Sequence, residues 1–251
     1  MGTSRSLSTP KGKKWRNVKS DITSTFTGTR DVPDGRIVSG VVSATGGISS
    51  GGARSGGGGR TKGITKAISK LGGFGAILAT SNLEKAIQSL DLPDLKDKSA
   101  TEIVSIVAER LSSNVSGIEA EALKKALQDT ILEASQLTEE GTYTDLEKSL
   151  QKFLQQEGIR GLVELFLAEY VFDFTWVFIE KYVQEKAKDG KSLEAFMTAH
   201  KSICGTKVKE KINEISKSKS FDSVDWFGKE GQRLANTIVA EIQKALLSLT
   251  Q

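Results

Sequence analysis

The sequence predicts an all-α protein, an irregular multi-helix bundle preceded by a long, flexible, basic N-terminal arm rich in glycine and serine. Two observations predict this fold. From about residue 64 onward, apolar residues recur with the period of amphipathic helices and are separated by helix-start signals. Before that point, large apolar residues are few and glycines are many. We therefore divide the 251 residues into an arm, 1–63, and an α-helical domain, 64–251.

The charge of the chain is also divided unevenly. Residues 1–63 hold eleven Lys and Arg against three acids, a net charge of +8, whereas the remainder carries a net charge of −4. Fourteen of the 25 glycines lie in the same segment. Because ordering a glycine costs much backbone entropy, we expect the arm to be disordered in isolation. One β-branched stretch, 35–42, could add a strand to a partner's sheet.

Helical patterning begins at 61–79, where Ile64, Ala67, Ile68 and Leu71 share one face. Three glycines that follow should weaken this helix or end it; they are Gly72, Gly73 and Gly75. A second short helix is expected at 82–90, stopped near Pro93.

Later helices are marked by capping boxes. In this motif a hydroxyl and a carboxylate three positions on satisfy amides that the start of a helix leaves unpaired. Three matches predict helix starts: Ser99 with Glu102, Ser116 with Glu119, and Thr144 with Glu147. A helix at 160–188 is apolar nearly all round and should lie at the centre of the bundle. Three more are expected, at 193–203, 207–217 and 225–249.

Few residues are of types that act in catalysis or bind metals, and we expect no enzyme, no cofactor and no metal site. His200 and Cys204, the one histidine and the one cysteine, are four residues apart, which is too few ligands for zinc. We interpret His200 as a helix-surface residue and Cys204 as a small apolar filler. Acids within the central helix should pair with lysines or meet a partner's basic surface; they are Glu164, Glu169 and Asp173.

The expected compartment is the cytoplasm. A single cysteine allows no intrachain disulfide, and residues 1–17 lack the apolar segment of a secretory signal. The longest apolar stretch, 162–179, contains three acids, each of which would be costly in lipid. We therefore expect no integral membrane association.

A basic cluster stands out in the arm: Lys11, Lys13, Lys14, Trp15, Arg16 and Lys19. These residues could contact nucleic acid or another anionic surface, and Trp15 could stack on a base. The cluster matches no established nucleic-acid motif, however. A partner-binding or nonspecific electrostatic role is an equally good interpretation.

The extreme N-terminus offers a reactive group. Removal of Met1 would expose Gly2, whose unhindered amine could enter another protein's active site. Residues 1–6 also fit the M-G-x-x-x-[ST] pattern of N-myristoylation, with the basic cluster as a second membrane signal. An unmodified start is the third interpretation that this short pattern allows.

Met1-Gly2-Thr3-Ser4, followed by a Gly/Ser-rich arm and a helical body, resembles the QatB family, the B components of bacterial Qat anti-phage systems. Members often continue Ser-Tyr-Gly-Gly-Pro, where this chain has residues 5–10, Arg-Ser-Leu-Ser-Thr-Pro. The resemblance implies a non-catalytic partner of a QueC-like enzyme. It also implies partners in the system's ATPase and its TatD-like nuclease.

QueC chemistry activates the carboxylate of a deazaguanine with ATP and passes it to an amine. The resemblance therefore implies that Gly2 is the acceptor of a covalent deazaguanine-type adduct, with Thr3 and Ser4 fitting the enzyme's entry channel, while the helical body docks the enzyme. Two alternatives stay open from the residues themselves. One is a membrane-associated adaptor myristoylated at Gly2, and the other is a nucleic-acid-binding structural protein that uses the basic arm.

Overall fold

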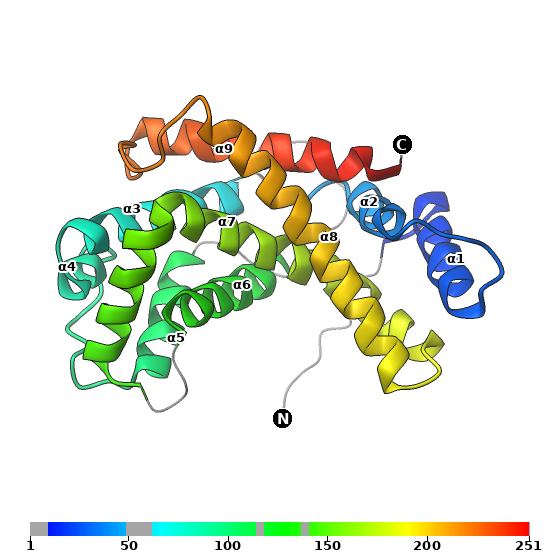
Figure 1. Ribbon diagram of the computed structural model, residues 1–251, viewed down its shortest axis with the longest axis horizontal. Coiled ribbons are helices and arrows are strands. Elements are labelled where there is room, and N and C mark those ends of the chain that lie inside the picture. The colour runs from blue at the N-terminus through cyan, green and yellow to red at the C-terminus, as the bar shows by residue number, and fades with distance from the viewer. Residues whose placement is uncertain (1–9, 49–61, 114–117, 137–140, 251) are drawn as a thin grey trace.

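The computed structural model describes residues 10–48, 62–113, 118–136 and 141–250. Within these ranges the chain is helical and has no β-strand, which confirms the predicted all-α fold. The elements are α1 (Lys13–Thr27), α2 (Asp34–Thr45), α3 (Lys62–Thr80), α4 (Leu83–Gln88), α5 (Ala100–Leu111), α6 (Ile118–Ser135), α7 (Tyr143–Lys186), α8 (Gly190–Ser216), α9 (Lys229–Leu247) and the 3₁₀ turn η1 (Ser248–Thr250). They form an elongated bundle, with α4 near one end and α1 near the other (Figure 1).

The central helix of the bundle is α7. Its second half is buried nearly all round, through side chains that include Phe166, Tyr170, Phe174 and Ile179. Neighbours cover it on all sides, because α6, α8, α3, α1 and α2 each pack against α7. The predicted central helix, 160–188, is therefore confirmed in position and in burial.

A sharp bend divides α7 at Gly158, whose φ of 67° and ψ of −174° are not helical. Such a conformation is essentially restricted to glycine. The bend leaves the backbone amides of a new helix start without partners, and the carboxylate of Asp222 accepts one of them, the Ile159 N–H, at 3.1 Å. The two helices predicted before and after this point are thus joined end to end through a bend.

The capping boxes had mixed outcomes. The box of Ser99 and Glu102 is present and begins α5. The box predicted at Thr144 and Glu147 is wrong by two residues, since Thr142 and Asp145 form it and begin α7. Glu147 instead accepts the Leu83 N–H at the start of α4, at 3.1 Å. Ser116 lies outside the described residues, although α6 follows it as expected.

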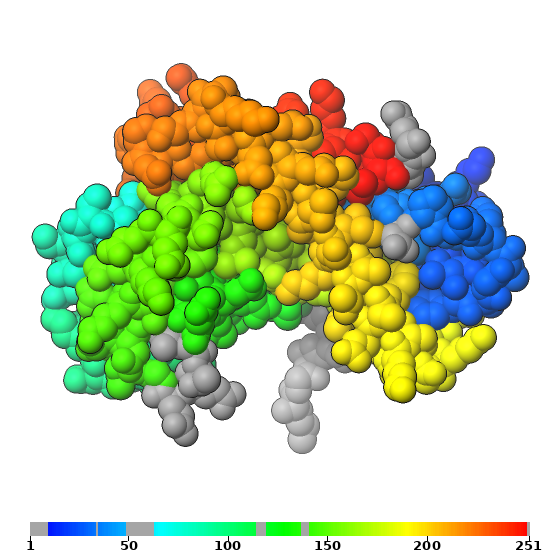
Figure 2. All heavy atoms as spheres, viewed as in Figure 1, coloured from blue at the N-terminus to red at the C-terminus, as the bar shows by residue number. Residues whose placement is uncertain are grey.

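The predicted flexible arm is wrong over much of its length, because α1 and α2 are packed helices. α2 alone buries Ile37, Val38, Val41 and Val42 against α8 and α9. The segment 35–42, which the sequence suggests could add a strand to a partner's sheet, is therefore helical. Figure 2 shows the blue atoms of this region lying against those of α8 and α9. Burial of these β-branched side chains offsets the entropic cost of ordering Gly40, which lies among them. For residues 1–9 and 49–61, the arm prediction lies outside the described residues.

The described residues that flank the segment 49–61 form hydrogen bonds with the core. The Tyr170 hydroxyl donates to the carbonyl of Ile48 at 2.7 Å, in the bundle interior. The buried Glu119 carboxylate forms a hydrogen bond with the backbone of Ile64 near the start of α3. Its Oε1 atom has no partner among the described residues, and burial raises the pKa of Glu119 to about 7.

Glycines in α3 provide space for a loop and do not end the helix, so of the two predicted effects, weakening the helix or ending it, the second is wrong. A Cβ at Gly72 would lie 2.3 Å from the ring of Trp226, and one at Gly73 would lie 2.4 Å from the ring of Phe227. Trp226 is buried, and its Nε1 donates to the Phe221 carbonyl at 2.8 Å. The loop before α9 therefore packs against α3 at these two glycines.

Two further helix boundaries differ from those predicted from the sequence. The helices predicted at 193–203 and 207–217 are one continuous helix, α8, which passes through Gly205. α9 begins at Lys229, because Asp225 holds a turn through its contacts with the Gly228 and Gly231 amides.

The close approach at Gly72 yields a stability prediction. Gly72→Ala should lower the free energy of unfolding by about 1–3 kcal/mol, because the fixed Trp226 ring cannot move away from the added methyl. This loss should exceed the gain of about 1 kcal/mol that alanine brings to a helix interior. Urea denaturation measures the difference.

Gly190→Ala is the matched control, since no atom lies within 4 Å of a Cβ at that position of α8. It should leave the stability unchanged or raise it slightly. A Gly72→Ala protein as stable as the Gly190→Ala protein would contradict the proposed packing.

A second prediction concerns pH. Because burial raises the pKa of Glu119 to about 7, from the ordinary value of 4.5, the folded state binds this proton more tightly than the unfolded state does. The contribution of Glu119 is thus fully present below about pH 4.5 and is lost as the pH rises through about 7. Glu119→Gln should abolish that part of the pH dependence, measured as the melting temperature between pH 4.5 and 8.

Glu121 sits two residues away on an exposed part of α6, so Glu121→Gln is the control and should keep the wild-type pH profile. If the Glu119→Gln and wild-type proteins lost stability in parallel over this range, Glu119 would not be the titrating group.

Candidate functional site

The residues predicted to meet a partner enzyme, Gly2, Thr3 and Ser4, lie outside the described residues. Their roles stay predictions. The structure does describe the point at which the preceding segment joins the folded body, since Pro10 is the first described residue and α1 begins three residues later.

α1 forms because its apolar residues share one face. Trp15, Val18 and Ile22 recur at helical spacing and are buried against the bundle. The helix ends at Gly28, whose left-handed backbone lets its N–H reach the Ser24 carbonyl at 2.9 Å. The helical spacing of these three apolar residues is the sequence signal for α1, and the interpretation of this region as a basic cluster did not use it.

Trp15 does not belong to an exposed contact surface. Its side chain is 5% exposed, so the suggested stacking on a nucleic-acid base is wrong. Its indole Nε1 has no hydrogen-bond partner among the described residues. The ring instead packs α1 against the body, and the basic residues on either side of Trp15 therefore face the solvent.

Four basic residues gather where α1 begins, and we call them the basic end of α1: Lys11, Lys13, Lys14 and Arg16. All four are exposed. Within the part of the chain that the structure describes, no carboxylate forms an ion pair with them, and the one polar contact is from Lys14 Nζ to the Ser43 carbonyl at 3.5 Å. Unpaired surface cations of this kind attract an anionic partner and raise its rate of encounter.

Lys19, the remaining member of the predicted cluster, is occupied differently. Its Nζ lies 5.3 Å from the centroid of the Tyr182 ring, and Lys186 Nζ lies at the same distance from that ring. The Tyr182 hydroxyl is 2.7 Å from the Thr23 Oγ1 atom. These contacts join α1 to the C-terminal end of α7.

Asp21 fixes α1 to the segment that follows it. The Asp21 side chain is buried and pairs with Arg30 and with Arg36, whose Nε lies 3.0 Å from Oδ2. α2 is held in turn by the Ser39 hydroxyl, which donates to the Leu247 carbonyl at 3.1 Å. The basic end of α1 therefore stands on a rigid support.

His200 and Cys204 lie on one face of α8, as their spacing predicted. The prediction that His200 is a surface residue is wrong, because the side chain is 3% exposed and its Nε2 lies 2.9 Å from the Thr175 Oγ1. Burial lowers the pKa of His200 to about 4 and raises the pKa of Cys204 to about 12. At neutral pH both are uncharged, and a thiol in that state is a poor nucleophile. Cys204 is a buried filler, as predicted.

The acids of the central helix meet lysines, which was one of the two predicted roles. Glu169 pairs with Lys201 at 2.8 Å, and Asp173 pairs with Lys125 at 2.5 Å. Burial raises the pKa of Asp173 to about 6. Glu164 is half-buried and its pKa is raised by burial, but it forms no ion pair with any of the described residues. Within the described ranges, no group of three or more His, Cys, Asp and Glu is arranged to hold a metal ion.

Comparison with known families identifies the chain. Residues 51–245 match the family described as Qat anti-phage system associated protein QatB. The chain belongs to the QatB family. It is thus a component of a Qat anti-phage defence system. No curated protein and no solved structure matches this QatB chain.

The matched segment starts after α1 and α2. The family assignment therefore rests on the helical body from the Gly/Ser tract to α9, and not on the N-terminal residues that first suggested the resemblance. None of the described helices of this QatB protein is both long enough and apolar enough to cross a membrane.

Proposed function

We propose that this QatB protein is a non-catalytic component that docks a QueC-like enzyme and presents Gly2, after removal of Met1, as the acceptor of a deazaguanine-type group. The observation that carries the proposal is membership of the QatB family, taken together with the Gly2-Thr3-Ser4 sequence. Thr3 and Ser4 would fit the entry channel of the enzyme.

The anchoring of α1 sets how far the acceptor can reach. Pro10 lies eight positions after Gly2, so a fully extended chain carries the Gly2 amine at most about 29 Å from the folded body. A tether of 63 residues would have allowed a distant partner. With this shorter one, the enzyme's catalytic pocket must come close to the start of α1.

The basic end of α1 is then the natural docking surface. Lys13 and Arg16 are exposed beside the point where the chain leaves the body, and they have no acidic partner among the described residues. An enzyme that accepts Gly2 would approach the body next to this surface. We expect it to place acidic side chains there, because like charges brought together at an interface would weaken binding.

The proposed reaction forms an amide bond. The deprotonated Gly2 amine attacks the carboxylate carbon of the deazaguanine, which the partner enzyme has activated as an adenylate with ATP. The new C–N bond replaces the acyl–phosphate bond, AMP leaves, and the amine loses a proton. A glycine suits this role because its amine has no side chain beside it to obstruct the attack.

One feature of the structure supports a non-catalytic role for this chain. His200 and Cys204, its one thiol–imidazole pair, are buried and uncharged at neutral pH. The ATPase and the TatD-like nuclease of the same system are further proposed partners. Cytoplasmic localisation also belongs to this proposal, since the activating enzyme requires ATP.

The first test is intact-mass measurement of the protein co-expressed with the other genes of its system. The wild-type chain should lose Met1 and gain the mass of one deazaguanine acyl group, located on the N-terminal peptide. Gly2→Ala should abolish the added mass and the protection against phage, because a β-carbon beside the amine hinders its attack.

Thr9→Ala, in the same segment but away from the acceptor, is the control and should keep both the modification and the protection. A myristoyl group at Gly2 would appear as a different mass and would support the membrane-adaptor alternative. An N-terminal peptide altered only by loss of Met1, with full phage protection, would refute conjugation.

A second test examines docking. The double variant Lys13→Glu/Arg16→Glu should bind the purified QueC-like enzyme at least about tenfold more weakly than wild type at low salt, by reversing the charge at the docking surface. The substitutions should not unfold α1, since acidic residues near a helix N-terminus are favourable. Surface plasmon resonance measures the affinity.

Lys148→Glu/Lys152→Glu is the matched control, because these exposed lysines lie on the first half of α7, away from α1. Equal weakening by both double variants would indicate a nonspecific charge effect. Unchanged affinity in the Lys13→Glu/Arg16→Glu protein would rule out this docking surface.

A further inference from the structure

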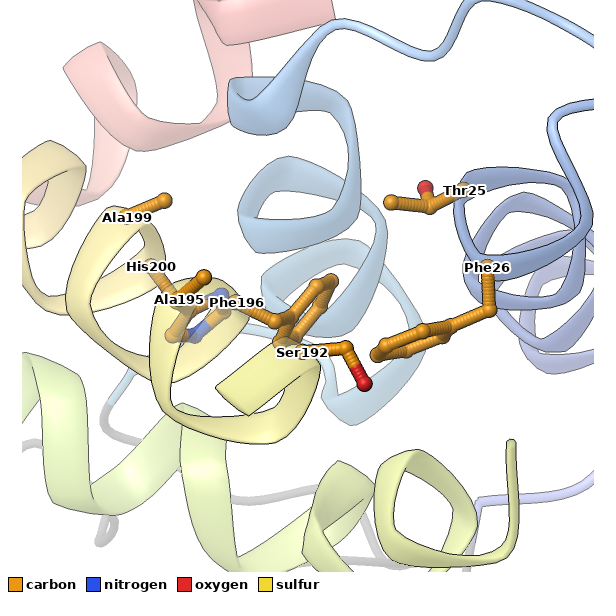
Figure 3. Close-up of a pocket in the computed structure, with 7 residues that line it drawn as sticks. All are labelled: Thr25, Phe26, Ser192, Ala195, Phe196, Ala199 and His200. Carbon is orange, nitrogen blue, oxygen red and sulfur yellow. The ribbon is translucent and has the colours of Figure 1, made fainter. Parts of the chain in front are cut away.

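A hollow of about 300 Å³ lies between α1 and α8 (Figure 3). Phe26 contributes to it from α1 and Phe196 from α8, and the two rings lie next to each other, tilted by 33°, with centroids 5.3 Å apart. His200 and Ala199 belong to its α8 side. No part of the proposed function uses this hollow, and it is distinct from the basic end of α1.

The lining of the hollow is apolar and uncharged. Besides the aromatic rings it includes two hydroxyl groups, and both already donate to backbone carbonyls: Thr25 to Asp21 at 3.0 Å, and Ser192 to Asp189 at 2.9 Å. An ion that entered would lose part of its hydration without gaining a counter-charge. The hollow therefore favours a neutral, aromatic occupant.

His200 supplies one polar atom. The Thr175 hydroxyl lies 2.8 Å from the Val171 carbonyl, to which it can donate, and 2.9 Å from His200 Nε2. The arrangement that uses both donors places the imidazole proton on Nε2, donating to Thr175 Oγ1, and we assign this tautomer from the network. Nδ1 is then an acceptor, and it has no hydrogen-bond partner among the described residues.

The environment keeps this acceptor available. Because burial lowers the pKa of His200 to about 4, the ring stays neutral at physiological pH and Nδ1 keeps its lone pair. Phe196 stacks against the imidazole with centroids 6.1 Å apart and an angle of 18° between the rings. The ring orientation is thus fixed by Thr175 on one side and by packing on another.

Size narrows the class of ligand. An apolar cavity of about 150 Å³ holds one benzene ring in a well-studied case, and small-molecule sites generally begin near 300 Å³. A hollow of about 300 Å³ therefore suits a molecule of two fused rings.

We propose that this hollow binds a neutral two-ring heteroaromatic molecule, which packs against Phe26 and Phe196 and donates a ring N–H to Nδ1 of His200. The stated chemistry is a planar bicycle with at least one N–H group and no net charge. The site is a binding site and involves no covalent step.

The test compares indole with benzofuran on the full chain. The two probes have nearly the same shape, but only indole carries a ring N–H. Isothermal titration calorimetry at pH 7 should give an indole affinity about tenfold higher than that of benzofuran, the difference expected for one hydrogen bond.

Three variants locate the binding. Ala199→Leu fills the hollow and should abolish indole binding, whereas Thr198→Leu adds a similar volume on the neighbouring exposed position of α8 and should leave it unchanged. His200→Phe keeps an aromatic ring without the acceptor and should make the two probes bind equally.

The proposal fails if benzofuran binds as tightly as indole to the wild-type protein, if neither probe binds up to its solubility limit, or if Ala199→Leu retains the wild-type indole affinity. Should His200→Phe not fold, the comparison of probes on the wild-type and Ala199→Leu proteins decides the question alone.

Discussion

The second half of α7 carries buried apolar side chains around most of its circumference, and the molecule is organised by the need to keep them from water. A helix of this kind has no face that can be left to solvent, so neighbours must surround it. α6, α8 and α3 supply most of that cover; α1 and α2 add to it, with Thr23 of α1 at Tyr182 and Ile48, just after α2, at Tyr170. Residues that look like a loose arm when taken alone are therefore needed as part of the core.

This dependence explains what the sequence could and could not predict. Local signals were sufficient for the helical body: the capping box at Ser99 and the apolar run after Arg160 each define an element by themselves. The box at Thr144 was misplaced because hydroxyls at 142 and 144 offer two registers, and only the helix geometry chooses between them. The sequence predicts only that Gly72 and Gly73 weaken the helix or end it, because the rings that occupy their space come from more than 150 residues later in the chain.

The candidate site was predicted only in part, for the same physical reason. The sequence identified the basic residues at the start of α1, but their exposure depends on Trp15, Val18 and Ile22 facing inward. Without the bundle to receive that face, an isolated α1 would lack the burial that offsets the entropic cost of ordering it. His200 was assigned to the surface because helical spacing alone cannot show that α7 covers that side of α8. Tertiary contacts also place Phe26 beside Phe196, a meeting that no sequence pattern indicates.

The connection between α8 and α9 has a consequence for how QatB proteins can diverge. It buries Phe221 and Trp226, and it places Asp222 at the bend of α7 while Trp226 rests on α3. One short stretch thus contacts both α3 and α7, which also pack against each other, and lengthening or shortening it would displace both attachments together. Insertions and deletions accumulate most readily where a loop supports nothing else. This loop should therefore keep its length across the family even where its sequence drifts, and an alignment gap there would mark a relative whose bundle is assembled differently.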